Sequence, residues 1–174
     1  ASNDTWGLCW DVHVMAHVYA ARAVLPGMIQ RGSGYLLQMS SAAGLLSQIG
    51  DAAYSATKHA AIGFAESVVI THGGDGIKVS VICPQYVATP MLGYADKGAS
   101  SDLPGVITPE ALAETVVEGV AQESFLILPH ADVAQFIQFK SANYDKWLGA
   151  MRKLRSKIVD EIGSTDLEAM HKLV

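Results

Sequence analysis

The chain has 174 residues, of which 50% are hydrophobic and 17% are charged, and its formal net charge at pH 7 is −5. This balance is typical of a single globular domain and excludes a disordered chain. No basic run or Lys/Arg stripe is present, so we expect neither nucleic acid nor a membrane as a partner. No apolar stretch reaches the roughly 18–20 residues needed to span a bilayer. Two cysteines in a chain of this length do not make a disulfide scaffold, and we expect a cytoplasmic protein.

The chain begins with a predicted helix and a predicted strand. Apolar residues recur at spacings of three and four over 6–30, which predicts a helix with Asp4 or Thr5 as its cap. The next apolar run, Tyr35–Ser41, has the length of a strand. Because its apolar residues are continuous rather than alternating, we expect this strand to be buried on both faces.

Helices and strands continue to alternate along the rest of the chain. Thr108 followed by Pro109 marks a helix start, because Thr caps a helix and Pro suits its first position. We expect the last helix to break near Gly149, and residues 131–174 to form a C-terminal helical extension. The remaining elements are expected to be a loop over 42–52, a helix over 53–71, a strand over 77–83, a long loop over 84–107, a helix over 109–122, a strand over 125–128 and a helix over 132–162.

The order of elements is helix, strand, helix, strand, helix, strand, helix. This alternation predicts a parallel sheet with right-handed crossovers. We therefore expect residues 1–174 to form a single partial domain with an α/β fold, part of a Rossmann-like, doubly wound parallel sheet. Such sheets bind ligands at the carboxyl ends of their strands. Ser41 and Pro84 both lie at such ends.

Tyr54 and Lys58 are the first candidates for chemistry. They are four residues apart on a predicted helix, so they share one face. A Lys ammonium close to a phenol favours the phenolate and brings the Tyr closer to the range where it exchanges protons. Taken alone, the pair is explained more simply as a surface Tyr that lies beside a Lys and has no catalytic role. Ser41, however, ends a predicted strand thirteen residues earlier, where its hydroxyl can bind a substrate oxygen beneath Tyr54.

A third segment follows the second predicted strand. Pro84 ends that strand, and exposed backbone there, with Thr89 as a donor, can hold a planar amide. An ordinary exit from a strand has the same sequence features. Together the three segments resemble the short-chain dehydrogenase/reductase family. The matching stretches are Met39–Gly44, Tyr54–Lys58 and Cys83–Pro90, and the resemblance extends to about residue 130.

The resemblance implies an NAD(P)-dependent alcohol dehydrogenase or carbonyl reductase that needs no metal. Tyr54 would be the catalytic acid/base, Lys58 would lower its pKa and bind the nicotinamide ribose, and Ser41 would orient the oxygen of a small alcohol or carbonyl substrate. The segment 91–107 would match the family's mobile substrate lid. NAD or NADP would contact Tyr54, Lys58, Pro84, Val87 and Thr89, and the substrate would contact Ser41, Tyr86, Met91 and Tyr94.

Two residues depart from the family pattern. His13 stands where the family usually has an Asn that holds a water in the proton relay. A His can also donate and accept hydrogen bonds, so we consider a catalytic His13 and a structural one equally. Tyr86 stands in a segment where many members have a Gly, and its bulk would narrow or block the substrate pocket.

The family's glycine-rich phosphate-binding turn is also missing, since no Gly-x-x-x-Gly-x-Gly occurs in the sequence. The residue that selects NAD or NADP is missing with it. We therefore expect the sequence to be the C-terminal, catalytic portion of a longer protein and to be inactive alone. The resemblance implies that the parent is a homo-oligomer, which packs the helix that carries Tyr54 and the helix over 6–30 against other copies. The alternative is a non-catalytic or truncated protein that uses this fold as a binding module.

Overall fold

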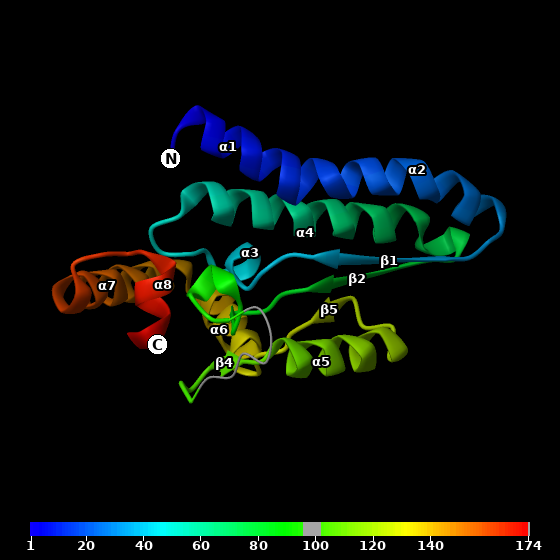
Figure 1. Ribbon diagram of the computed structural model, residues 1–174. Helices are drawn as coiled ribbons and strands as arrows, with labels where there is room; N and C mark the ends of the chain where they lie inside the picture. The colour runs from blue at the N-terminus through cyan, green and yellow to red at the C-terminus, as the bar shows by residue number, and fades with distance from the viewer. Residues whose placement is uncertain (96–101, 174) are drawn as a thin grey trace.

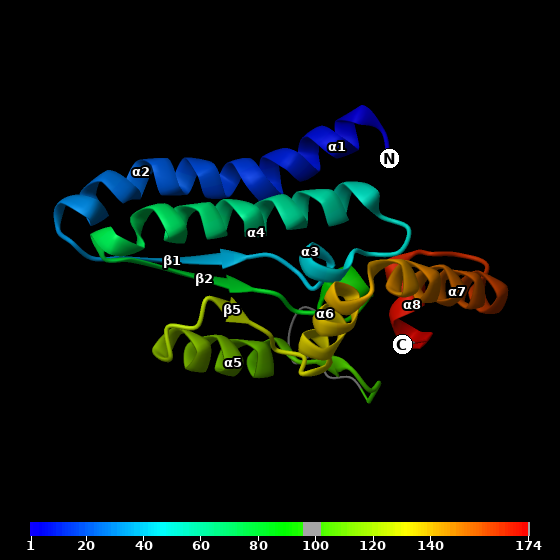
Figure 2. The same ribbon diagram turned by 180° about the vertical axis from the view of Figure 1, so that it is seen from behind.

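The computed structural model describes residues 1–95 and 102–173. At its centre is a parallel sheet with the strand order β1-β2-β5, as the alternation of helices and strands predicts. Helices α2 and α4 lie side by side on one face of the sheet, and α5 lies on the opposite side (Figure 1 and Figure 2). The three strands are β1 (Gly34–Met39), β2 (Ile77–Ile82) and β5 (Leu126–Ile127). The helices are α1 (Asn3–Trp10), α2 (Ala16–Gln30), α3 (Ala43–Leu46), α4 (Ala52–His72), α5 (Pro109–Ala121), α6 (Asp132–Ala142), α7 (Tyr144–Ile162) and α8 (Leu167–Met170).

The N-terminal helix is a continuous rod of α1, a π-helical turn over Asp11–Met15, and α2. Its cap is Ser2, whose side chain accepts a hydrogen bond from the backbone N–H of Thr5 at 3.2 Å. The predicted caps, Asp4 and Thr5, are therefore wrong, because Ser2 already satisfies this end of the helix. π-turns are rare, and they occur often at functional sites.

The same rod, Asn3–Gln30, is long and apolar enough to cross a membrane by length and composition. The prediction that no stretch reaches that length is therefore wrong for this helix. In the structure the helix lies along α4 on the covered side of the sheet (Figure 1). Length and composition alone do not place a helix in a bilayer.

The main core lies between the sheet and α4. Its fully buried members come from these two layers and pack through continuous apolar contacts. They are Ile62, Ala65, Val68, Ile77, Val79, Val81 and Cys83. Cys9 and Cys83 are both free thiols, and burial raises the pKa of Cys83 to about 11, so Cys83 is a small buried neutral side chain.

Strand β1 is buried on one face and open on the other. Gln38 and Ser40 are buried, and the Ser40 hydroxyl donates to the Lys58 carbonyl on α4 at 3.0 Å. Leu37 and Met39 point the other way and are 46% and 44% exposed. The predicted burial of both faces is wrong, because the described residues leave the outer face of this edge strand uncovered. β1 is also the edge strand of the described sheet, and the unpaired backbone groups of such edges pair readily with other chains.

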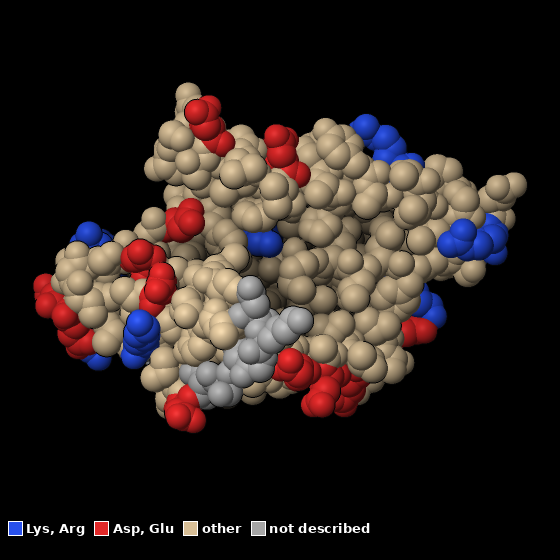
Figure 3. Space-filling view, in the orientation of Figure 1, with Lys and Arg blue, Asp and Glu red and all other residues tan. Residues whose placement is uncertain are grey.

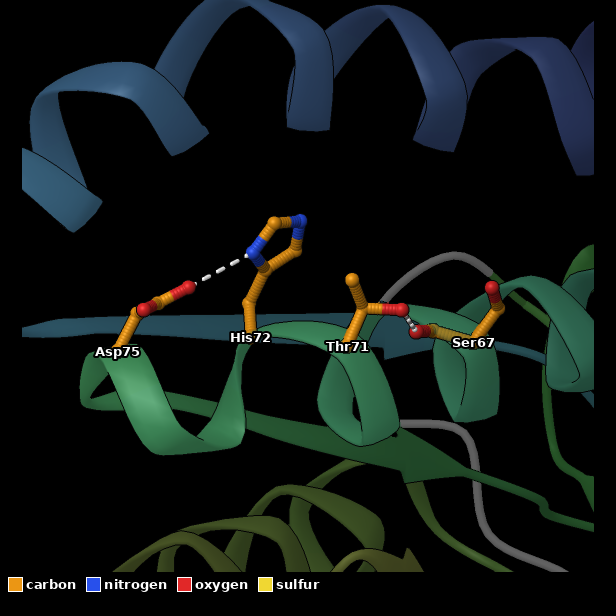
Figure 4. Close-up of polar contacts among 4 residues, drawn as sticks. All are labelled: Ser67, Thr71, His72 and Asp75. Atoms are coloured by element: carbon orange, nitrogen blue, oxygen red, sulfur yellow. Dashed lines mark hydrogen bonds and ion pairs between the residues drawn. The ribbon is translucent and has the colours of Figure 1, made fainter.

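Helix α4 is anchored at both ends by side chains. Asp51 caps its start by accepting from the backbone N–H of Tyr54 at 2.9 Å. At the other end, the Thr71 hydroxyl donates to the Ser67 carbonyl at 2.7 Å, and His72 Nδ1 hydrogen-bonds Asp75 Oδ2 at 2.9 Å (Figure 4). These contacts lie within α4 and its flanking residues, and they stabilise the two ends of the helix that carries Tyr54.

Two predicted loops contain short regular elements. The loop over 42–52 includes α3, and the loop over 84–107 includes β3 (Tyr86–Val87) and β4 (Val106–Ile107). These two strands pair in parallel and form a second, separate sheet. Part of the predicted lid, residues 96–101, lies outside the described residues. The β3–β4 pair therefore ties the C-terminal end of the lid to the segment that precedes the lid.

The long C-terminal helix breaks at Asn143 rather than near Gly149, which was the predicted position. The Asn143 side chain accepts from the Lys146 backbone N–H at 2.9 Å and so caps α7. Gly149 remains helical within α7. Helices α6, α7 and α8 form the expected C-terminal helical extension, and its last turn buries Met170 and His171.

Candidate active site

The ends of β1 and β2 bring two of the predicted segments together. The strands pair in parallel with Met39 opposite Ile82. Pairing continues beyond both strands, because the Ser40 N–H donates to the Ile82 carbonyl at 2.9 Å and the Ala42 N–H donates to the Pro84 carbonyl at 2.8 Å. Ser41 is therefore held beside Pro84 at the carboxyl edge of the sheet, as the sequence predicts.

Tyr54 and Lys58 lie over this edge on the first two turns of α4. The Lys58 Nζ lies 5.5 Å from the centre of the Tyr54 ring and 3.5 Å from the Met39 carbonyl oxygen. Helix α3 approaches α4 closely at Gly44, where a Cβ atom would lie 2.7 Å from the Lys58 carbonyl oxygen. The lack of a side chain at Gly44 thus allows the Ser41 loop to sit directly against the helix that carries Tyr54.

Burial dominates the electrostatics of the pair. It raises the pKa of Tyr54, and a hydrogen bond between the Tyr54 and Ser41 side chains opposes this effect. Burial also lowers the pKa of Lys58. The resemblance implies that Lys58 lowers the pKa of Tyr54, whereas here the net direction is upward. Tyr54 is therefore a protonated phenol at neutral pH in this structure. The Ser41 hydroxyl donates to the Pro84 carbonyl at 3.4 Å and accepts from the Ala43 N–H at 3.1 Å.

The segment after β2 is held by a histidine that the sequence analysis missed. The Gln85 N–H donates to His130 Nδ1 at 3.1 Å, so the proton of the neutral ring is on Nε2, which donates to the Tyr86 and Gly105 carbonyls, each at 3.1 Å. Burial lowers the pKa of His130. Its position just after the third predicted strand was the available signal, since that strand also ends at the ligand-binding edge.

These segments surround a cavity of about 510 Å³. Ligand pockets of small molecules commonly fall between roughly 300 and 1,000 Å³. Figure 3 shows a hollow in this face with basic atoms inside it and acidic side chains only on the surrounding surface. The predicted site residues that line the cavity are Ser41, Tyr54, Lys58, Pro84, Tyr86, Val87, Thr89 and Met91.

The comparisons with known proteins agree with this arrangement. A family model for the short chain dehydrogenase matches residues 1–99. The chain belongs to this family. Epidermal retinol dehydrogenase 2 of Homo sapiens is 39% identical over 124 residues, which cover 69% of this chain and 40% of that protein. The chain thus spans less than half the length of this curated relative.

Solved structures of short-chain dehydrogenases share the fold. One from Burkholderia phymatum, in complex with NAD, has a TM-score of 0.70 at 20% identity and covers 83% of this chain and 60% of its own. Another from Sphingobium yanoikuyae, in complex with NADPH, has a TM-score of 0.61 at 26% identity and covers 84% of this chain and 54% of its own. These likenesses confirm the predicted Rossmann-like α/β fold.

Two of the residues predicted from the family pattern do not line the cavity. Tyr94 packs against the C-terminal turn, where its hydroxyl lies 3.3 Å from Nε2 of the buried His171. His13 is on the far side of Tyr54, with their ring centres 5.2 Å apart in an edge-to-face arrangement. Tyr86, which the family pattern suggested as an obstruction, lines the cavity without filling it.

His13 has a defined hydrogen-bonding state. Its Nδ1 lies 2.9 Å from Thr57 Oγ1, and the Thr57 hydroxyl donates to the Ala53 carbonyl at 2.8 Å. Thr57 therefore accepts from His13, and Nε2 is the acceptor nitrogen of the neutral ring. Burial, followed by the nearby Lys58 charge, lowers the pKa of His13. Helix α4 and the π-helical turn are thereby linked directly behind Tyr54.

The residues present fit one end of a nicotinamide cofactor. Lys58, Pro84, Val87 and Thr89 line the same cavity as Tyr54, and the Thr89 hydroxyl donates to the Val87 carbonyl at 3.2 Å. This arrangement offers a cation, a hydroxyl and backbone groups to a ribose and a planar amide. The sequence contains no glycine-rich turn that would bind the pyrophosphate.

Proposed function

We propose that the chain supplies the catalytic part of an NAD(P)-dependent oxidoreductase, an alcohol dehydrogenase or carbonyl reductase. The observation that carries the proposal is the meeting of Ser41, Tyr54 and Lys58 at one end of a single cavity. These three residues come from two separate segments, the loop after β1 and the helix α4, and Ser41 is near enough to Tyr54 to lower its pKa. The family to which the chain belongs supports the same reaction class.

Tyr54 is the acid/base of the proposed reaction. In reduction its phenol donates a proton to the carbonyl oxygen, and in oxidation its phenolate accepts the proton of the alcohol. Burial keeps the pKa of Tyr54 above its usual value near 10.0, so the proton donor is the form present at neutral pH. The Ser41 hydroxyl holds the substrate oxygen, and the Lys58 ammonium stabilises the phenolate when it forms.

The cofactor is NAD(H) or NADP(H), which when bound would supply the hydride in reduction and accept it in oxidation. Lys58 would hold its ribose, while Pro84, Val87 and Thr89 would hold the amide of its nicotinamide ring. The solved relatives bound to NAD and to NADPH support a nicotinamide cofactor without separating the two. Tyr86 and Met91 would border the substrate beside Ser41, since both line the cavity.

His13 acts in this proposal from behind Tyr54. Its neutral ring donates to Thr57 and contacts the edge of the Tyr54 ring. Because it does not line the cavity, it acts on the reaction through Tyr54 rather than on the substrate. Replacing His13 with Asn, the residue typical of the family, tests this role. A catalytic contribution predicts a changed pH profile of turnover, whereas a structural role predicts only a changed melting temperature.

The proposal is tested by assaying the full-length protein with alcohols and ketones in the presence of NAD(H) and NADP(H). Tyr54→Phe should lower turnover by about 10²–10⁴-fold, the range that a positioned acid/base contributes. Tyr19→Phe is the matched control, because Tyr19 is 57% exposed and on another helix. Full turnover in Tyr54→Phe would refute the assignment. An absence of both turnover and cofactor binding would favour a binding module.

We also propose that the full-length protein is a homo-oligomer. Large apolar side chains are exposed on the N-terminal rod and on α4. Leu8 and Tyr19 of the rod are 65% and 57% exposed, and Ile70 of α4 is 81% exposed. Burying such a surface against a second copy would be favourable. Sedimentation equilibrium should give a dimer or larger species, and Ile70→Glu should shift it toward the monomer. A monomer at all concentrations would refute the proposal.

A further inference from the structure

The cavity continues beyond Tyr54 into a wall made by the C-terminal extension. Trp147, Met151, Leu154 and Ile158 recur at spacings of four and three, so they form one stripe along α7. All four line the cavity, and Leu167 and Met170 of α8 complete the wall. Trp147 is buried in a cluster with Ala42, which lies next to Ser41. The extension is therefore packed directly against the catalytic corner, by which we mean Ser41, Tyr54, Lys58 and Pro84.

Several apolar side chains that line this cavity remain exposed to solvent. Met91, Phe136 and Leu154 are 65%, 44% and 38% exposed, although all three line the cavity. An apolar ligand would remove this surface from water, which is the main source of favourable energy in such pockets.

The charges of the cavity are confined to one end. Lys58 is the one charged side chain among the described residues that line it. The charged residues of α7, which include the basic Arg152, Lys153 and Lys157, do not line the cavity. The Lys140 ammonium lies 5.0 Å from the centre of the Trp147 ring, but it does not line the cavity and donates to the Leu45 carbonyl. A ligand that carried a charge into the α7 end would therefore lose its hydration without reaching a charged group among the described lining residues, and this is costly. The wall therefore selects against charge as well as for apolar surface.

We propose that the α7 end of the cavity binds the uncharged, apolar body of an elongated alcohol or ketone, and that the α7 stripe selects the substrate. The position of the substrate oxygen at Tyr54 and Ser41 rests on the proposed function, whereas the choice of an apolar body rests on the wall alone. The two are therefore separable by experiment. Leu154 is the key specificity residue, because it lines the cavity at 38% exposure and lies outside the buried clusters.

The first test measures binding of straight-chain alcohols to the 174-residue chain. The chain has three Trp residues. Trp6 and Trp10 are 40% and 46% exposed, whereas Trp147 is buried and lines the cavity. With Trp6→Phe and Trp10→Phe in place, the fluorescence of Trp147 reports occupancy. Affinity should rise about threefold to fourfold per methylene from 1-butanol to 1-decanol. No dependence on chain length, or no binding at all, would overturn the proposal.

The second test moves a charge into the wall. The unsubstituted chain should bind 1-decanol at least about tenfold more tightly than 10-hydroxydecanoate, because the carboxylate would be placed against apolar side chains. Leu154→Lys should reverse this order by pairing with the carboxylate. Leu148→Lys is the matched control on the same helix, since Leu148 is 45% exposed and does not line the cavity. Equal binding of the two ligands by the unsubstituted chain would overturn the proposal.

Tyr54→Phe and Ser41→Ala separate this inference from the proposed function. If both variants keep the chain-length dependence but weaken 1-decanol binding relative to decane, the inference and the oxygen site both stand. If they leave the alcohol and decane unchanged, the apolar wall stands and the oxygen site fails. If Leu154→Lys does not fold, as judged by its circular dichroism, Leu154→Gln replaces it. It should lower 1-decanol affinity by about threefold or more.

Discussion

The two ends of the cavity differ in how their residues are held. At the catalytic corner, Ser41 and Pro84 are fixed by backbone hydrogen bonds that extend the β1–β2 pairing, and Tyr54 lies on a helix capped by Asp51. At the opposite end, the wall depends on side-chain packing between Trp147 of α7 and the residues around α3. Backbone pairing gives the corner a geometry that does not depend on its side chains. The shape of the wall depends on its side chains, so substitutions there can change which substrate fits.

The largest expected effect comes from removing the anchor of the wall. Trp147→Ala should lower the free energy of unfolding by about 3–5 kcal/mol, because a buried Trp leaves a large cavity that the structure fills only in part. Trp10→Ala should cost far less, since Trp10 is 46% exposed. Urea denaturation of both variants measures the difference. Equal losses would show that α7 is not anchored through Trp147.

The next effect is on the catalytic corner and should be mainly a loss of turnover. Ser41→Ala should lower turnover of the full-length protein by about 10²-fold, the loss found when one positioned donor to a reacting oxygen is removed. Ser47→Ala is the control, because Ser47 lines the same cavity outside the Ser41–Tyr54–Lys58 cluster. Steady-state kinetics and melting temperatures measured together distinguish the two roles. Some loss of stability is also expected, because the Ser41 hydroxyl accepts from the Ala43 N–H at 3.1 Å and donates to the Pro84 carbonyl at 3.4 Å. Unchanged turnover in the folded variant would contradict a catalytic assignment.

A smaller effect tests the contact that joins the corner to the sheet. Gly44→Ala places a Cβ atom 2.7 Å from the Lys58 carbonyl oxygen, and the backbone must shift, at a cost of about 1–3 kcal/mol. Gly149→Ala has open space around it in the middle of α7, and it should instead stabilise the chain by about 0.5–1 kcal/mol. The melting temperatures of Gly44→Ala and Gly149→Ala should therefore shift in opposite directions from that of the unsubstituted chain. A stabilised Gly44→Ala would show that α3 does not pack as described.

The smallest effect is a pH dependence of stability. Burial lowers the folded-state pKa of His130 below its usual value of 6.5, so its neutral form is favoured by folding. Its contribution is full above pH 6.5 and is lost as the pH falls through the folded-state pKa. Protonation of Nδ1 would also remove the acceptor for the Gln85 N–H.

Chemical denaturation at a series of pH values checks this expectation. The free energy of unfolding should fall between pH 7 and pH 5, and it should fall less steeply in His130→Gln. His13 and His17 shift in the same direction because of burial, so the variant should keep part of the slope. A slope that is identical in His130→Gln would show that His130 does not titrate on unfolding.

The corner could be predicted from the sequence because parallel strands place their carboxyl ends together, so Ser41 and Pro84 had to be neighbours. The α7 stripe is equally visible as a pattern, but the pattern does not say which surface it meets. Asn143 and Gly149 show the same limit at the level of one helix. Either residue can end a helix, and the break falls at Asn143 because its side chain caps α7.

His130 and the open face of β1 show what the sequence left undetermined. The role of His130 depends on backbone groups of Gln85, Tyr86 and Gly105, which come near it only in the folded chain. The exposure of Leu37 and Met39 depends on what covers an edge strand. An apolar run reads the same whether its outer face is covered or open.

The π-helical turn at Asp11–Met15 sets the rotational phase of the N-terminal rod. Each residue of an α-helix advances the side chains by about 100°, so the extra residue of a π-turn offsets α1 from α2 by roughly that angle. Deleting one residue here would leave a regular helix but would turn Trp6 and Cys9 to a new side relative to α4. The turn that holds His13 against Thr57 therefore also determines which side chains of α1 and of α2 face α4.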